Sequence, residues 1–356
     1  MTRPKATMAL TTSTLRSTTS KHATPSALRA LGLVACAALL VAVAVLSLRL
    51  GSVSISNADV WNALFHYQQD SYNQTVVRSL RLPRTLVGLG VGAALAVAGA
   101  TTQATTRNPL GDPSILGINS GAAFAVVTAL YFGGLTSSYE YVWFAFGGAL
   151  GAFVLVYLVA SGGRGGATPI KLALAGAIVA SLLSSWTTAL LLLDEQALDV
   201  VRFWLAGSLA GRELGVFWTV LPFLGAGVAG ALLMSRQLNV LSLGDDIARS
   251  LGMHTGRIRL SAAVLVVLMA GGSVAAAGPI AFVGLAVPHI VRTVVGPDYR
   301  WILAYSLLVG PVLLLGADIT GRLVVRPAEL QVGVITAFCG APFLIAIARS
   351  RRVAEL

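Results

Sequence analysis

Charge is scarce in this chain. Of its 356 residues 11% are charged, against about 25% in ordinary soluble domains, and only three residues are lysine (Lys5, Lys21 and Lys171). None of these lysines lies in a G-x-x-x-x-G-K-[ST] loop, which excludes nucleotide binding of the P-loop kind. No acidic residue is expected well inside a membrane span, where carriers driven by protons or sodium keep their ionisable relay. A transporter of this composition needs energy from another protein.

Cysteine and histidine are also rare. Cys36 and Cys339 lie in apolar runs at opposite ends of the chain without C-x-x-C spacing, so neither a disulfide framework nor a zinc site is predicted. His289 has no second His, Cys or acid at ligand spacing, and we interpret it as structural. We therefore predict no metal site, no cofactor and no catalytic residue. A membrane-embedded enzyme would need paired acids, a histidine cluster or an activated nucleophile, and none is visible.

Apolar residues dominate instead, at 56% of the chain. The basic residues behind the net charge of +11 are scattered singly between apolar runs, a pattern that argues against nucleic-acid binding. A span needs roughly 20 apolar residues, and backbone groups in lipid must be satisfied internally. We predict an all-α polytopic membrane protein with ten transmembrane helices, near residues 29–48, 84–104, 114–134, 141–161, 170–193, 216–235, 259–277, 280–295, 301–317 and 331–348.

The first 28 residues are rich in Ser and Thr, and we expect a disordered cytoplasmic tail before a single ten-helix domain at 29–350. Most basic residues lie in loops on the same side of the membrane as the N-terminus, and loops rich in Lys and Arg face the cytoplasm. Because ten spans return the chain to the same side, we expect both the N- and the C-terminus in the cytoplasm. Glycines spaced four apart, such as Gly88 with Gly92 and Gly147 with Gly151, predict close helix packing.

One polar stretch, LSLGDDIARSLGMHTGRIRL at 241–260, interrupts the apolar runs on the predicted cytoplasmic side. Asp245 can cap a short helix from Asp246 to Ser250 or Leu251, and Gly252 can end it. Ile247 and Leu251 then share one face. The pattern fits a handle for a soluble subunit and an ordinary solvated loop equally well.

A second segment, 81–123, reads as two helices joined by a tight inner turn. Pro83 stands at a permitted helix start, and Asn108-Pro109 followed by Asp112-Pro113 marks a break and a capped restart. Arg81 and Arg84, three apart, are expected on one exposed face at the outer surface. There they would meet either lipid phosphates or a carboxylate-bearing partner.

Four ordered blocks carry a family resemblance: RNPLGDPSILGINSGAA at 107–123, WLAGSL at 204–209, GPIAFVGLAVPHIVR at 278–292 and PAELQVGVITAFCGAPFLI at 327–345. They resemble the FecCD family, the permease subunits of iron-siderophore, haem and cobalamin ABC importers, including the cobalamin-importer permease. The resemblance implies a type II ABC importer permease in a bacterial inner membrane, with no ATPase activity of its own. Where relatives commonly read PxELPxG, this chain has Gln331 at the second proline position.

The resemblance also implies partners: two cytoplasmic ATPase subunits, a second permease subunit, identical or homologous, and an extracytoplasmic binding protein. It places a coupling loop at about 241–259, with ATPase contacts expected from Asp245, Asp246, Ala248, Arg249, Leu251, Gly252 and Met253. Outer-surface arginines of the family pair with glutamates of the binding protein, and the matching positions are Arg81, Arg84 and Arg322.

The expected function is import of an iron-siderophore complex by alternating access. Cobalamin or haem import by the same mechanism is the alternative cargo, because these permeases share the motifs. A secondary carrier is a less favoured class. Candidates for lining the path are the span after the inner turn and the TTQATT stretch at 101–106.

Overall fold

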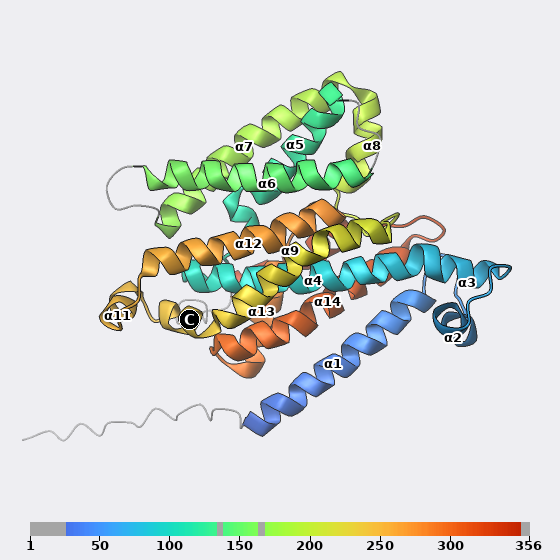
Figure 1. Ribbon diagram of the computed structural model, residues 1–356, viewed down its shortest axis with the longest axis horizontal. Helices are drawn as coiled ribbons and strands as arrows, with labels where there is room; N and C mark the ends of the chain where they lie inside the picture. The colour runs from blue at the N-terminus through green and yellow to red at the C-terminus, as the bar shows by residue number, and fades with distance from the viewer. Residues whose placement is uncertain (1–25, 134–137, 163–167, 350–356) are drawn as a thin grey trace, which may run out of the picture.

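The computed structural model describes residues 26–133, 138–162 and 168–349. Residues 1–25 of the predicted tail lie outside them, and helix α1 already begins at Ser26. Within the described residues the chain is helical, with no strand. We call the end of the bundle that carries α11 the inner end, and the end that carries α2 and α3 the outer end (Figure 1).

Each predicted span coincides with a helix, and these helices are α1 Ser26–Arg49, α4 Leu82–Thr106, α5 Ile118–Gly133, α6 Ser138–Ser161, α7 Pro169–Leu193, α9 Leu214–Leu233, α12 Thr255–Ala277, α13 Val283–Val295, α14 Tyr299–Val324 and α15 Val332–Arg349. In the described part of the chain, seven helices have the length and composition to cross a membrane. The apolar segments of α5, α13 and α15 are shorter, at 10 to 17 residues. The structure is a multi-helix membrane bundle.

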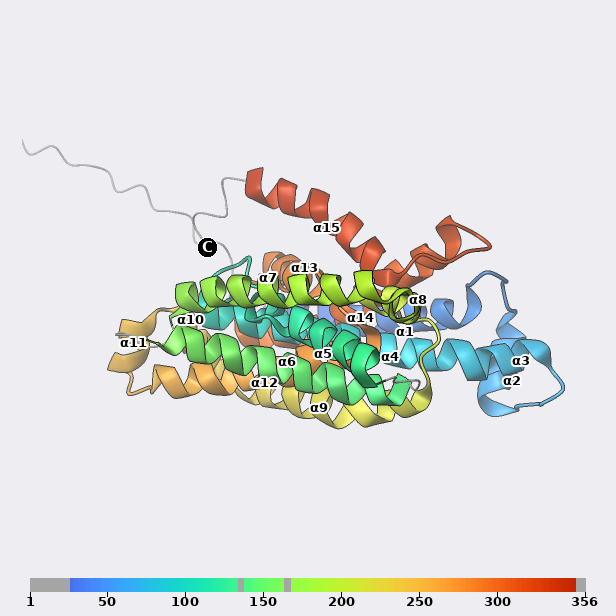
Figure 2. The ribbon, with the colours of Figure 1, turned by 90° about the horizontal axis from the view of Figure 1, so that it is seen from above.

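Helix α4 forms the centre of this bundle. It lies among α9, α12, α13 and α14, while α5, α6 and α7 form a further layer that α8, Glu195–Leu205, crosses at its outer end (Figure 1). The apolar stretch of α4 is 78% buried, whereas that of α1 is 11% buried on the flank of α14. Helix α15 extends away from the bundle on the side of α7 (Figure 2).

Glycine lets α4 and α14 approach at backbone distance. A Cβ added at Gly92 would lie 2.7 Å from the Cα of Pro311, and one added at Gly310 would collide with the carbonyl of Gly92. Gly88 likewise abuts Leu315, so the close packing predicted for the Gly88 and Gly92 pair is confirmed. The prediction for Gly147 and Gly151 is wrong, because a Cβ at either position meets nothing within 4 Å.

The central helix starts earlier than the predicted span, which began at residue 84. The continuous helical run that contains α4 begins at Tyr72, where α3, Tyr72–Val76, and a π-helical turn at Val77–Arg81 lead without a break into α4. Pro83 is therefore inside a continuous run, and the wider turn before it accommodates its missing N–H. Before this run, α2 at Asn57–Phe65 packs its buried side against the outer end of α1.

The inner turn after α4 has the predicted chemistry. Arg107 ends α4 in the left-handed conformation, with φ of 52°. Asp112 then caps the short 3-10 helix Pro113–Leu116, and its carboxylate accepts the N–H of Ser114 at 2.8 Å. The capped restart is confirmed.

Candidate functional site

The predicted coupling loop forms two short helices at the inner end, α10 at Ser235–Ser242 and α11 at Asp245–Ser250 (Figure 1). Leu238 and Leu241 are fully buried, so α10 is anchored to the bundle by its apolar side. Helix α11 projects beyond the ends of the long helices (Figure 1). The loop is a folded hairpin fixed to the bundle through α10.

Gly244, and not Asp245, stands at the cap of α11, with φ of 116° and no side-chain cap. Asp245 is the first helical residue, and its carboxylate accepts a hydrogen bond from Arg259 of α12 at 2.8 Å. The capping role predicted for Asp245 is wrong because this ion pair takes its carboxylate. The pair braces α11 against the start of α12.

The end of α11 matches the prediction. Gly252 has φ of 79°, its N–H donates to the carbonyl of Arg249, and the N–H of Met253 donates to that of Ala248. These two bonds form a Schellman motif, which satisfies the last carbonyls of the helix. A side chain at Gly252 would strain this turn.

An apolar face along α11 and its two flanking residues is left uncovered by the part of the chain that the structure describes. We call Leu243, Ile247 and Leu251 the apolar coupling face: they are spaced four apart and are 61%, 48% and 63% exposed. The charged side chains of Asp246 and Arg249 flank it in solvent, whereas Ala248 faces inward and Met253 is half-buried. Of the predicted contact residues, Asp246, Arg249, Leu251 and Gly252 are thus exposed and available to another protein. Leu243 and Ile247 were not among the predicted contacts, although their i, i+4, i+8 spacing with Leu251 is visible in the sequence.

The three predicted docking arginines come together at the outer end, but in the interior. Arg81 is 8% exposed, Arg84 is 9% exposed and Arg322 is 2% exposed. The exposure expected for Arg81 and Arg84 is therefore wrong. Their contact with a binding protein stays a prediction.

Two of these arginines bind the C-terminal end of α1. Arg81 donates to the carbonyls of Leu48 and Arg49, and Arg322 donates to those of Ser47 and Leu50. The last carbonyls of a helix have no intrahelical donors, and positive charge is favourable there. These contacts join α1 to α4 and α14 across more than 270 residues in the case of Arg322, so no local pattern could reveal them.

Asp318 is the centre of this group. Its carboxylate is fully buried, 2.8 Å from Nη2 of Arg84 and 2.7 Å from Nη2 of Arg322. Arg84 also contacts Glu329, in the loop before α15, at 2.7 Å. The five residues Arg81, Arg84, Asp318, Arg322 and Glu329 form what we call the outer cluster. The expectation of no acid inside a span is wrong, because α14 extends seven residues past the predicted end, from 317 to 324.

A further arginine lies in the outer loop between α8 and α9. Burial lowers the pKa of Arg212 to about 10, so it stays charged at neutral pH. Its Nε donates to the carbonyl of Ser208 at 3.2 Å, and no carboxylate pairs with it among the described residues.

The surface of α7 carries hydroxyl groups on a helix of membrane-spanning length. Ser181, Ser184, Ser185 and Thr188 are all exposed, although the apolar stretch of this helix has a hydropathy of 1.8. The TTQATT candidates differ, because Thr101, Thr102 and Gln103 are buried against the neighbouring helices. The exposed face of α7 thus carries four weakly polar side chains along a membrane-length helix.

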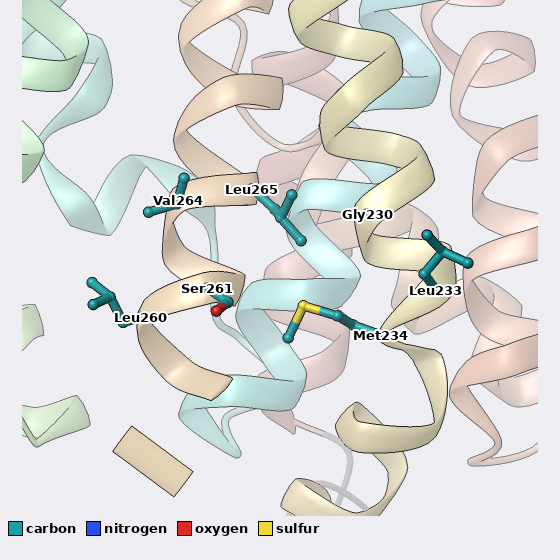
Figure 3. A pocket seen from close by; sticks show the side chains of 7 residues that line it. All are labelled: Gly230, Leu233, Met234, Leu260, Ser261, Val264 and Leu265. Atoms are coloured by element: carbon teal, nitrogen blue, oxygen red, sulfur yellow. The ribbon is translucent and has the colours of Figure 1, made fainter. Parts of the chain in front are cut away.

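An apolar groove opens between α9 and α12 near the inner end (Figure 3). Its lining includes Leu233, Met234, Leu260 and Leu265, and its one polar side chain is Ser261. It offers no ligand to an iron chelate. His289 packs edge-on against Phe343 of α15, with ring centroids 5.8 Å apart. Among the described residues, no three His, Cys, Asp or Glu side chains are grouped as a metal site would need.

Comparison with known proteins assigns the chain to a family. A model described as the FecCD transport family matches residues 39–350. The chain belongs to the FecCD transport family. A ferric enterobactin transport system permease of Escherichia coli (strain K12) is 46% identical to it over 314 residues, which cover 88% of this chain and 93% of the relative. An Fe(3+)-citrate import system permease of Bacillus subtilis (strain 168) is 44% identical over 308 residues, covering 86% of this chain and 91% of the relative.

A solved structure described as an inward-facing conformation of a metal-chelate type ABC transporter superposes with a TM-score of 0.79 at 31% identity, covering 90% of this chain and 99% of that one. PsaBC from Streptococcus pneumoniae shares the fold, with a TM-score of 0.57 at 16% identity over 84% of this chain and 98% of that one.

Three of the four FecCD sequence blocks meet in space. The N–H of Ser208, in WLAGSL, donates to the carbonyl of Ala277, next to the GPIAF block. The N–H of Gly333, at the start of α15, donates to the carbonyl of Gly207. A Cβ at Gly207 would lie 2.4 Å from the carbonyl oxygen of Pro279, so these family blocks pack at backbone distance.

Proposed function

We propose that this protein is the permease subunit of an ATP-binding-cassette importer that carries an iron-siderophore complex inward across the cell membrane. The observation that carries the proposal is the likeness, over most of both chains, to permeases named for ferric enterobactin and Fe(3+)-citrate. The names of these relatives set the substrate class as chelated ferric iron. The bacterial origin of both supports a bacterial inner membrane as the location.

In this proposal, the ATPase subunits contact and move the permease through α11. The apolar coupling face is exposed at the inner end, and burial of large apolar side chains is the main favourable term in protein association. Asp246 and Arg249 beside it supply charges that orient a partner. Two cytoplasmic ATPase subunits would each receive one such helix.

A second permease subunit, identical or homologous, would complete the passage through which the substrate crosses the membrane. The hydroxyls of Ser181, Ser185 and Thr188 donate to carbonyls one turn back on α7, and their oxygens would give a passage a weakly polar wall. Two subunits that face each other through α7 would enclose such a passage without charged groups to hold the cargo. Alternating access then follows from motion of the two subunits.

An extracytoplasmic binding protein would dock at the outer end. Glu329 is the outer-cluster carboxylate best placed for exchange, because its side chain is 32% exposed. A carboxylate of the binding protein would replace Glu329 on Arg84 and so reach the buried arginines. If docking proceeds by this exchange of carboxylates, then Arg81, Arg84 and Arg322 can take part in it although they are buried.

The orientation proposed is ten crossings with both termini in the cytoplasm, as the positive-inside pattern favours. Cobalamin or haem is the alternative cargo. A secondary carrier is disfavoured because Asp318, the acid inside α14, is held between two arginines and is not a free proton relay.

Uptake into proteoliposomes tests the proposal. The permease is reconstituted with its co-purified ATPase and loaded binding protein, and the probes are ferric enterobactin, ferric citrate and a ferric hydroxamate labelled with radioactive iron. ATP-dependent uptake of at least one is expected. Uptake of labelled cobalamin or haem alone would overturn the cargo, and iron uptake without ATPase would overturn the mechanism.

A further inference from the structure

An amide side chain joins the coupling hairpin to the start of α14. Asn239, on α10, donates through Nδ2 to Oδ1 of Asp298 at 2.7 Å, and its Oδ1 accepts the N–H of Tyr299 at 2.8 Å. Asp298 is also the cap of α14, since the same Oδ1 accepts the N–H of Arg300 at 3.0 Å. The Asn239 side chain thus holds two groups at the first turn of α14.

The same helix start is held from two other elements. The hydroxyl of Tyr299 accepts a hydrogen bond at 2.9 Å from Nη2 of Arg292 on α13. The same nitrogen lies 3.4 Å from Oε1 of Gln103 on α4. We call Gln103, Asn239, Arg292, Asp298 and Tyr299 the inner clamp. It brings α4, α10, α13 and α14 together, and Asn239 is its one member from the hairpin that carries α11.

Helices α4 and α14 form one body from the clamp outward. The contact of Gly92 with Gly310 and Pro311 brings the two helices together at backbone distance, with no side chain between them. Their outer ends are joined by the ion pair of Arg84 with Asp318, and Arg322 ties them to α1. A displacement applied at the inner end of α14 is passed to the outer cluster along this helix, past Pro311, and through its contacts with α4.

We propose that Asn239 is the positioning residue through which movement of the coupling hairpin reaches the α4–α14 body, and through it the outer surface. The inference rests on the proposed function, since it presupposes that an ATPase moves α11. The buried side chains of Leu238 and Leu241 hold α10 on the bundle but are non-directional. The Asn239 contacts are directional, one of them to a charged acceptor, and so transmit a shift along α14.

The test compares Asn239→Asp, Asp298→Asn and the double exchange N239D/D298N in the reconstituted transporter. The single change at 239 places two carboxylates face to face. The double exchange restores an amide–carboxylate pair of opposite sense and keeps an acceptor for the N–H of Tyr299, with loss only of the first-turn bond to Arg300. Gln237→Glu is the matched control, because it adds the same charge to an exposed position of α10.

The quantity measured is iron imported per ATP hydrolysed, together with the yield of intact complex. We expect N239D to lower this ratio about tenfold, within the usual range of coupling between sites. Hydrolysis should continue, N239D/D298N should recover most of the ratio, and Q237E should leave it unchanged. A ratio unaffected by N239D, one not recovered by the double exchange, or an equal loss in Q237E would overturn the inference.

If the proposed function itself is wrong, the result differs from the one that refutes the role of Asn239. The wild-type complex then shows no ATP-dependent iron uptake at all. If the wild type imports iron and changes in the apolar coupling face uncouple it while N239D does not, only the role of Asn239 is refuted.

Discussion

Replacement of Asp318 by asparagine removes the charge at the centre of the outer cluster. The cluster holds three arginines against two carboxylates, so Asp318→Asn raises its net charge from +1 to +2 without a change of shape. The carboxylate is fully buried between Arg84 and Arg322, so the lost attraction is not screened by water. Removal of one partner from a buried ion pair costs about 3–5 kcal/mol.

That cost is measured by thermal unfolding of the purified protein in detergent. At about 2 °C per kcal/mol for a chain of this size, Asp318→Asn should lower Tm by about 6–10 °C. Asp199→Asn breaks an ion pair with Arg202 in which both side chains are more than half exposed, and should cost under about 1 kcal/mol. Glu329→Gln, at a side chain 32% exposed, should lie between them. An equal Tm for Asp318→Asn and Asp199→Asn would refute the reasoning.

Three further changes test separate parts of the structure. Gly92→Ala should destabilise by about 1–3 kcal/mol because its Cβ meets backbone, whereas Gly147→Ala should be neutral or stabilising; equal Tm values would contradict the packing of α4 on α14. Serine at all three positions of the apolar coupling face should reduce ATPase co-purification about tenfold or more, and an unchanged yield would place the contact elsewhere. Glu329→Gln should tighten binding-protein affinity about two- to fivefold by freeing an edge of Arg84, and an unchanged Kd would exclude carboxylate exchange.

The helices were predictable from sequence because hydrophobic length determines them. Every predicted span coincides with a helix, and Gly252 ends α11 because its turn needs a positive φ. Asp112 caps its short helix through a bond to a residue two positions away. These features depend on neighbours along the chain.

The errors concern residues whose partners are distant in sequence. Arg84 was expected at the surface, but its partners Asp318 and Glu329 lie more than 230 positions away. Asp245 has the sequence context of a cap, but Arg259 from the next helix takes its carboxylate. Gly147 and Gly151 have the same spacing as Gly88 and Gly92, and only the arrangement of the helices distinguishes the two pairs. The spacing of residues along a helix shows which of them share a face, but it does not show which other helix covers that face.

The most direct test of the central claim is iron import per ATP hydrolysed in proteoliposomes that contain the permease, its ATPase and the loaded binding protein. The account predicts that the wild type imports ferric siderophore only with ATP. It also predicts that a permease with serine at Leu243, Ile247 and Leu251 imports at least about tenfold less at matched permease content. Iron uptake by that variant equal to wild type, or uptake by the permease alone without ATP, would contradict the claim that another protein's ATP hydrolysis drives this one through α11.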